Sequence, residues 1–524
     1  MKKYLLPTAL FIGIFGHILF WEKEPGIAYP IFIIVSLLAG FVLLRSERSH
    51  PAPRTYILIA ITILFALLTA VRKDYLSTFL NASLSLLCLL ILAMTYIKGS
   101  WARFNALDYI HRFFHLLGSS FILPWKFIAS INKNHNHDDE PNNKRVFGRI
   151  MLGLLLSLPI LAIFTTLLAN ADLVFAQRLE NLIEHFTVED LAELLARIFL
   201  ILFTAYVFIS LTLYAYEKSS ETDDPSHKAA SIPPFLGYIE GTVILSSVVL
   251  LFSAFVLIQF QYFFSGQSNI TSAGFTYAEY ARRGYSELIL VACFSFIMLQ
   301  VLGSILKIKT SGQRKGFIAL SVVLLACVLV ILLSAFQRLS LYEAAYGFTT
   351  LRTYAHVFII WLGLLLIARI VLEIINRQDA FANLLLFTAI GFTLSLNILN
   401  PGSLIVRKNI ERTLQGESLD YSYLSTLTSD ATPALVHAFS SPEFSQDTHD
   451  EIAAALLCRY VPISTRPTPW QSFNLSAYLA DRSLARAQTQ LDTYGVFEEP
   501  DDFVFEIHTP DGNVIPCYPD AAID

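Results

Sequence analysis

Long apolar stretches fill most of the first 400 residues of this 524-residue chain. A helix needs about 20 predominantly apolar residues to cross about 30 Å of hydrocarbon, because the bilayer interior offers no water to the backbone. About eleven stretches meet this requirement. They lie near residues 4–21, 27–44, 55–71, 76–97, 150–170, 197–216, 241–264, 286–306, 316–337, 352–375 and 382–400. The sequence therefore predicts an all-α integral membrane helix bundle.

The basic residues predict the orientation of this bundle. Lys and Arg are concentrated in every second loop, above all between residues 98 and 149, and such loops stay on the cytoplasmic side. Met1-Lys2-Lys3 resembles the start of a signal peptide, but no small-residue cleavage site follows and a second span comes at once. We expect a retained first helix with the N-terminus inside and, after an odd number of spans, a C-terminal segment outside. If one span were wrongly assigned, that segment would lie inside.

The segment after residue 400 differs from the rest of the chain. It holds 18 acidic and 7 basic residues, and its apolar residues are spaced rather than continuous. Helices are predicted over 433–439, 450–460 and 475–491, and two strands over 503–508 and 513–517 flank the turn at residues 510–512. We therefore expect a small, mainly helical extracytoplasmic domain that ends in a β-hairpin.

The five cysteines constrain the fold little. Cys458 and Cys517 both fall in the C-terminal segment, where an outside location would permit a disulfide. No cysteine spacing indicates a disulfide framework, so two unpaired thiols are the favoured interpretation.

Four parts follow from these patterns. They are an N-terminal four-helix membrane region (1–97), a cytoplasmic interfacial helix and polar loop (98–149), a seven-helix membrane region (150–400) and an acidic soluble domain (401–524). Apolar residues from Trp101 to Leu117 recur at steps of three and four, which predicts a helix lying in the headgroup plane or packed against the bundle. The polar run 132–140 contains two histidines, but no second ligand pair accompanies them. A solvated loop is expected there, with no metal and no cofactor.

Polar and aromatic residues cluster at the predicted outer ends of the later spans. Glu287 enters the eighth span, where an ionisable group is costly unless it is paired, and Arg338 is its natural partner. The candidate ligand-binding residues are Asp172, Tyr277, Glu279, Tyr280, Arg282, Arg283, Glu287, Arg338, Tyr342, Glu343, Tyr346, Arg352, Tyr354, Arg407 and Asn409. If the bundle brings them together, they form a pocket suited to a phosphate, carboxylate or glycan headgroup. The alternative is that they are an aromatic belt with snorkelling anchors, which accounts well for single residues.

Several motifs in these segments resemble a known family. TYAEYARRG at 276–284, RLSLYEAAYGFTTLRTY at 338–354, LNPGSLIVRKNI at 399–410 and WQSFNL at 470–475 are similar to an uncharacterised family of bacterial multi-spanning membrane proteins, a domain of unknown function. One departure is that Pro401-Gly402-Ser403 stands where an acidic residue is expected after the proline. The resemblance implies an integral protein of the bacterial cytoplasmic membrane and assigns no activity.

Function must therefore be argued from the candidate residues. No motif for nucleotide binding, metal hydrolysis or acyl transfer is present, so an enzyme is not the favoured interpretation. We expect a cell-envelope binding, sensing or assembly protein whose partners are the lipid bilayer and an envelope protein or a lipid or glycan headgroup, with no nucleic acid. One alternative is a transporter of a small or lipid-linked anionic solute. Another is a membrane transferase with Glu279 or Glu287 as the base and Arg282, Arg338 or Arg352 as phosphate clamps.

Overall fold

The computed structural model describes residues 2–47, 49–104, 106–134, 191–217, 234–264, 284–375, 377, 380–460, 468–498 and 505–517, together with isolated positions between 157 and 178. Within these ranges, 9 helices are long and apolar enough to cross a membrane. They are α1 (Lys2–Phe20), α2 (Ala28–Ser46), α4 (Tyr75–Thr95), α8 (Leu191–Glu217), α9 (Tyr238–Phe264), α12 (Tyr285–Ile305), α13 (Ser311–Tyr346), α14 (Thr350–Ile374) and α15 (Phe381–Leu399). The prediction of a multi-pass helical membrane protein is confirmed.

Two of the eleven predicted spans are not among these helices. The stretch 55–71 forms α3 (Thr55–Thr69), whose 15 residues give a rise of about 22 Å, short of the hydrocarbon thickness. The stretch 150–170 lies largely outside the described residues. In contrast, α13 has 36 residues and a length of about 54 Å, so it extends well beyond the hydrocarbon.

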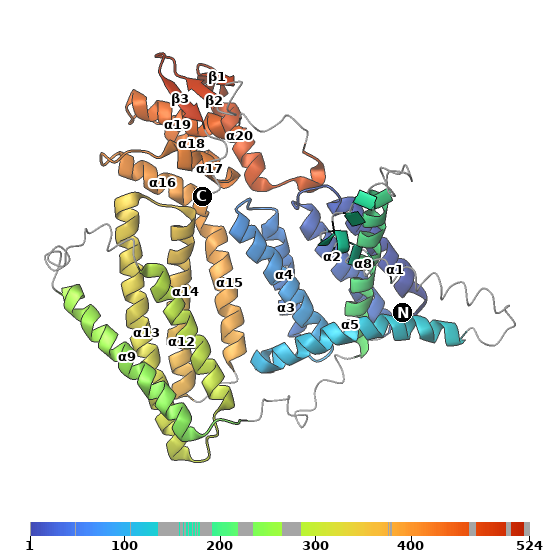
Figure 1. The fold of residues 1–524 in the computed structure, drawn as a ribbon. Helices are drawn as coiled ribbons and strands as arrows, with labels where there is room; N and C mark the ends of the chain where they lie inside the picture. Colours follow the sequence, from blue (N-terminus) through green and yellow to red (C-terminus); the bar gives the residue numbers. More distant parts are fainter. Residues whose placement is uncertain are drawn as a thin grey trace.

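The membrane helices form two groups, each with its own apolar core (Figure 1). In the first group, α1, α2, α4 and α8 bury residues such as Leu5, Ile12 and Leu213. In the second, α9, α12, α13 and α14 bury Leu299 and Leu324. The two groups meet where α4 contacts α15.

One long helix, α5 (Ala106–Asn134), crosses the ends of the first group on the side away from the C-terminal domain (Figure 1). Leu116, Leu123 and Phe127 are buried in the core that α1 and α8 share, whereas Phe121 is 73% exposed and Trp125 is also exposed. This helix, preceded by the short η1 (Ser100–Arg103), therefore packs on the bundle and still presents an apolar face outward.

The C-terminal domain is mainly helical, as predicted. Its elements are α16 (Pro401–Thr413), α17 (Tyr421–Thr426), η4 (Ser429–Ala431), α18 (Thr432–Phe439), α19 (Gln446–Tyr460), η5 (Trp470–Ser472), α20 (Leu475–Leu491), β1 (Gly495–Glu498), β2 (Phe505–His508) and β3 (Val514–Cys517). The predicted hairpin is present as β2 and β3, with Ile507 opposite Ile515, and β1 pairs with β2 as a third antiparallel strand that was not predicted. The sheet packs on α19, whose four consecutive residues Ala453–Leu456 are buried.

The preference for unpaired thiols in this domain is wrong. Cys458 near the end of α19 forms a disulfide with Cys517 at the end of β3, across a Cα–Cα distance of 5.4 Å. The strands that carry Cys517 fold back over α19, and this return of the chain is a tertiary feature that cysteine spacing does not encode. The bond closes a segment of 59 residues.

We predict that removing this bond destabilises the C-terminal domain. Cross-links of this loop length typically contribute about 2–4 kcal/mol, because they restrict the unfolded chain. A Cys458→Ser/Cys517→Ser variant should unfold at a lower temperature in detergent and should lose the sensitivity to reductant that the wild type shows. Cys327→Ser, which changes a thiol in α13, should keep that sensitivity; equal reductant responses in all three proteins would contradict the prediction.

Candidate functional site

The turn between α13 and α14 is held by interactions among the predicted motif residues. Gly347 ends α13 with φ of 83°, a left-handed conformation that favours glycine. The Arg352 guanidinium donates to the Gly347 carbonyl oxygen at 2.6 Å and lies 3.9 Å from the centre of the Tyr342 ring. Tyr342 also contacts the rings of Tyr285 and Tyr346. Arg352 therefore stabilises the conformation of this turn.

Helix α16 packs over the same turn. The side-chain amide of Asn409 accepts from the N–H of Phe348 and donates to its carbonyl oxygen, both at 2.9 Å. Arg412 donates to the Ala345 carbonyl oxygen at 3.3 Å, near the end of α13 where carbonyls lack helical partners. A Cβ on Gly347 would lie 2.7 Å from the Arg412 guanidinium, so this approach needs glycine.

A buried carboxylate joins the C-terminal domain to the first helix group. Asp430 in η4 is 1% exposed. It accepts from the backbone N–H of Lys73 at 2.8 Å and pairs with the Arg72 guanidinium at 3.4 Å. Arg72 also donates to the Asn397 carbonyl oxygen at the end of α15. The loop between α3 and α4, the end of α15 and the C-terminal domain thus meet at one charge pair.

Further buried polar contacts extend this junction. The amides of Asn81 and Asn397 bond reciprocally between α4 and α15, at 2.9 and 3.0 Å. Asp74 caps α4 and accepts from the Tyr354 hydroxyl of α14. Asn474, 4% exposed at the start of α20, donates to the carbonyl oxygens of Thr69 and Arg72.

Arg459 adds a second cation near Asp430. Burial lowers the pKa of Arg459, while Tyr460 and Asp430 act in the opposite direction. The guanidinium lies 3.5 Å from the Ser429 hydroxyl. A buried carboxylate flanked by two arginines is well compensated, which suits a fixed joint between domains.

A cavity near the predicted residues lies under α16, against the C-terminal end of α13 and the N-terminal half of α14. Its volume is about 690 Å³. Apolar side chains form most of the walls: Phe336, Phe348, Val357, Ile360, Leu399 and Leu404. Charged side chains of α16 and the following residues form the rim: Lys408, Glu411, Arg412 and Glu417. These rim charges pair with one another, Lys408 with Glu411 at 2.8 Å and Arg412 with Glu417 at 3.6 Å.

Glu343 supplies the buried charge of this cavity. It is 3% exposed, and its Oε2 lies 3.0 Å from Nδ1 of His356. Nε2 of His356 lies 3.2 Å from the Ser340 hydroxyl, which also donates to the Phe336 carbonyl oxygen at 3.0 Å. Glu343 Oε1 and the Thr353 hydroxyl, both buried, have no hydrogen-bond partner among the described residues. Two residues that line the cavity therefore each keep a buried polar atom without a partner among the described residues.

The structure distributes the predicted residues over several places. Asp172 accepts from the N–H groups of Val174 and Phe175 as a local cap. Glu287 is exposed and interacts electrostatically with Arg338, whose guanidinium lies over Gly284. Arg407 is exposed and donates to the Ser403 carbonyl oxygen. The predicted residues Tyr277, Glu279, Tyr280, Arg282 and Arg283 lie outside the described residues.

Of the predicted residues that the structure describes, only Glu343 lines the cavity. Tyr342, Tyr346, Arg352 and Asn409 hold the turn beside it, and Tyr354 belongs to the domain junction. Sequence reasoning missed His356, although an ionisable residue inside an apolar stretch is itself a signal. It also missed Asp430, which nothing in the local sequence distinguishes from a surface acid.

We predict that Asp430→Asn loosens the C-terminal domain from the first helix group. Breaking a buried pair leaves a charge without its partner and typically costs about 3–5 kcal/mol; we expect roughly 2–3 kcal/mol because Arg72 is 19% exposed. Hydrogen exchange in the loop between α3 and α4 should accelerate. Glu24→Gln, which breaks the exposed Lys73–Glu24 pair in the same region, is the matched control and should change stability by less than about 1 kcal/mol. Equal effects of the two variants would contradict the assignment.

Comparison with known proteins places these features in a family. Residues 59–438 match the family described as a domain of unknown function, DUF4153. The match begins within α3 and ends within α18, so it includes the turn, the cavity and Asp430. Comparison with curated proteins finds no match, and comparison with solved structures finds none either. Because the match covers well over half of its length, this chain belongs to the DUF4153 family.

Proposed function

We propose that this integral membrane protein binds an amphiphilic ligand in the cavity under α16, with the headgroup at Glu343. The observation that carries the proposal is Glu343, a buried acid that lines the cavity and whose Oε1 has no hydrogen-bond partner among the described residues. Leaving a buried charged group unsatisfied is costly, so a ligand that donates a hydrogen bond there would recover that cost. An ammonium or a sugar hydroxyl has this chemistry.

The walls of the cavity favour a ligand with an apolar part. Ile360 and Leu399 line it and are 51% and 39% exposed, so the cavity opens along helix faces of the kind that contact lipid chains. The paired charges of the rim add polar partners at the level of a headgroup. A lipid or glycolipid headgroup fits this combination better than a free anion does, because the innermost charge is negative.

We place this cavity on the extracytoplasmic side of the bacterial cytoplasmic membrane, with the N-terminus inside. The basic loops favour that orientation. The Cys458–Cys517 disulfide supports it independently, because disulfides persist in oxidising compartments such as the periplasm. A C-terminal domain anchored over the cavity would then sense or pass on ligand binding to an envelope partner.

A membrane transferase is the second candidate, and the Ser340–His356–Glu343 chain is the observation that favours it. With a proton on Nδ1, His356 would donate to Glu343 and accept the Ser340 proton, the order of nucleophile, base and acid in acyl transfer. Ser340, however, lies inside a regular helix, where neighbouring N–H groups are engaged in helical hydrogen bonds. The helical turn of α13 that contains Ser340 thus offers no free backbone N–H groups to an oxyanion. Ligand binding is therefore the better-supported function.

The binding proposal predicts loss of ligand in Glu343→Gln. The substitution keeps the side-chain volume and removes a charge-assisted hydrogen bond, so occupancy of a co-purified lipid-like ligand in native mass spectra should fall roughly tenfold to hundredfold. Stability without ligand should change by less than about 1 kcal/mol, since Gln can still accept from His356. Glu287→Gln, at an exposed acid of α12, should retain the ligand. Wild-type protein that carries no such ligand, or equal occupancy in both variants, would refute binding at this cavity.

A fluorophosphonate probe separates the two candidates. Such probes form a covalent adduct with an activated serine hydroxyl. We expect no adduct on Ser340, because its hydroxyl is held by the Phe336 carbonyl and lacks an oxyanion site. Labelling that disappears in both Ser340→Ala and His356→Ala would establish the transferase instead.

A further inference from the structure

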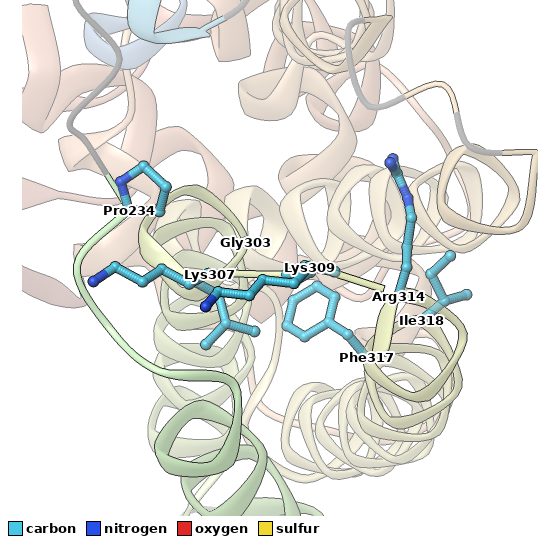
Figure 2. A pocket seen from close by; sticks show the side chains of 9 residues that line it. Pro234, Gly303, Lys307, Lys309, Arg314, Phe317 and Ile318 are labelled. Atoms are coloured by element: carbon cyan, nitrogen blue, oxygen red, sulfur yellow. The ribbon is translucent and has the colours of Figure 1, made fainter. Parts of the chain in front are cut away.

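A second cavity lies at the other ends of α12 and α13, about 50 Å along α13 from the turn with α14. Its volume is about 420 Å³. Pro234, Gly303, Leu306, Ile308, Phe317 and Ile318 give it an apolar lining, and Lys307, Lys309 and Arg314 give it positive charge. Figure 2 shows Lys307 and Lys309 extending in the same general direction, whereas Arg314 points away from them. This cavity is remote from the site described above.

The backbone around Lys307 is held in an extended conformation. Leu236 forms a parallel β-bridge with Leu306. The N–H of Leu236 donates to the carbonyl oxygen of Ile305, and the carbonyl oxygen of Leu236 accepts from the N–H of Lys307 at 2.9 Å. Successive side chains of an extended segment alternate between faces, so Lys307 and Lys309 share one face. The bridge fixes the backbone at Leu306 and Lys307, and Figure 2 shows the two lysine side chains extending to the same side.

The following turn is fixed as well. Thr310 and Gln313 form a capping box at the start of α13, and Gln313 also accepts from the Lys309 N–H at 2.8 Å. Gly303 leaves the floor open, since a Cβ there would meet only the edge of Phe317 at 3.9 Å. The basic residues thus stand on a rigid backbone around a preformed hollow.

The charges of Lys307 and Lys309 are not balanced by an acid within the described part of the chain. Lys307 and Lys309 form no ion pair with any residue described there, and no acidic residue lines the cavity. The nearest acid on the bridging segment, Glu240, lies against Gly237 in the first turn of α9 and is not part of the lining. Two lysines that share a face over an apolar floor attract an anion that also has an apolar part.

We propose that this cavity binds the phosphate of an anionic phospholipid, with Lys307 and Lys309 on the headgroup and an acyl chain against the apolar lining. Basic pockets at the ends of membrane helices bind such headgroups through the same combination of charge and apolar surface. Free phosphate has the same anionic chemistry, but it would leave Leu306, Ile308 and Phe317 without a partner. This inference does not rest on the cavity under α16 or on the orientation of the chain.

Lipid binding by the full-length protein tests this inference. In nanodiscs or detergent, wild type should retain phosphatidylglycerol over phosphatidylcholine in native mass spectra. Lys307→Gln/Lys309→Gln should lose roughly tenfold or more of the phosphatidylglycerol affinity, since each cation near an anionic headgroup contributes severalfold. Gly303→Leu, which fills the hollow without changing charge, should weaken binding as well.

Matched controls make the outcome decisive. Arg45→Gln/Arg54→Gln removes two exposed cations that, like Lys307 and Lys309, lie in predicted inner segments, and it should leave the preference intact. Equal losses in the two double variants would overturn the site in favour of a general effect of basic loops. Thermal stabilisation by inorganic phosphate alone, abolished in Lys307→Gln/Lys309→Gln, would assign the cavity to a free anion and overturn the lipid assignment. Unchanged gel-filtration profiles of the variants will show that they fold.

Discussion

The contact between Asp430 and Arg72 is the constraint on which the arrangement of this protein depends. It joins residues that are 358 positions apart in the sequence. Arg72 also bonds the end of α15, so one guanidinium holds the first helix group, the second helix group and the C-terminal domain together. A charge pair with one fully buried partner is stabilising only when both partners and their hydrogen bonds are in place. The Lys73 N–H and the Thr428 hydroxyl on Asp430, and the Asn397 carbonyl oxygen on Arg72, meet that condition.

The cavity under α16 is a consequence of the same docking. Pairing Asn409 and Arg412 with the turn after α13 lays α16 across the helix ends, and the space between becomes a partly apolar hollow. Because α13 is longer than the hydrocarbon is thick, Glu343 in its last turn lies near a membrane surface. The acid, the histidine and the apolar walls are thus placed where a headgroup and its chains would meet.

Much of the fold could be predicted from local pattern. Apolar runs located all nine helices that can cross a membrane in the described part of the chain, and spaced apolar residues located α18, α19 and α20. The strand β1 was missed because Gly495–Glu498 is short and follows a helix directly. The disulfide was missed because its partners are brought together only by the packing of the sheet on α19.

Less of the site could be predicted. The motif 338–354 was recognised, but its residues Arg352, Tyr342 and Tyr346 hold the turn after α13, and of the described ligand-binding candidates only Glu343 lines the cavity. The residue type indicates which hydrogen bonds or ion pairs a side chain can form. Which partner it meets depends on how the packed helices are rotated relative to one another. His356 faces Glu343 only because α13 and α14 are antiparallel neighbours in one register.

Asp430 and Asn474, which join the C-terminal domain to the first helix group, come late in the sequence, and this has a consequence for biogenesis. Residues 401–517 leave the ribosome after every described membrane helix, yet Asp430 is the counter-ion of Arg72, and Asn474 bonds backbone carbonyls at the end of α3 and in the loop after it. Until that late segment reaches its place, Arg72 lacks its counter-ion, and the carbonyl oxygens of Thr69 and Arg72 lack the Asn474 amide. Membrane proteases degrade such incompletely packed intermediates, so the degradation of this protein would depend on whether its C-terminal domain has docked.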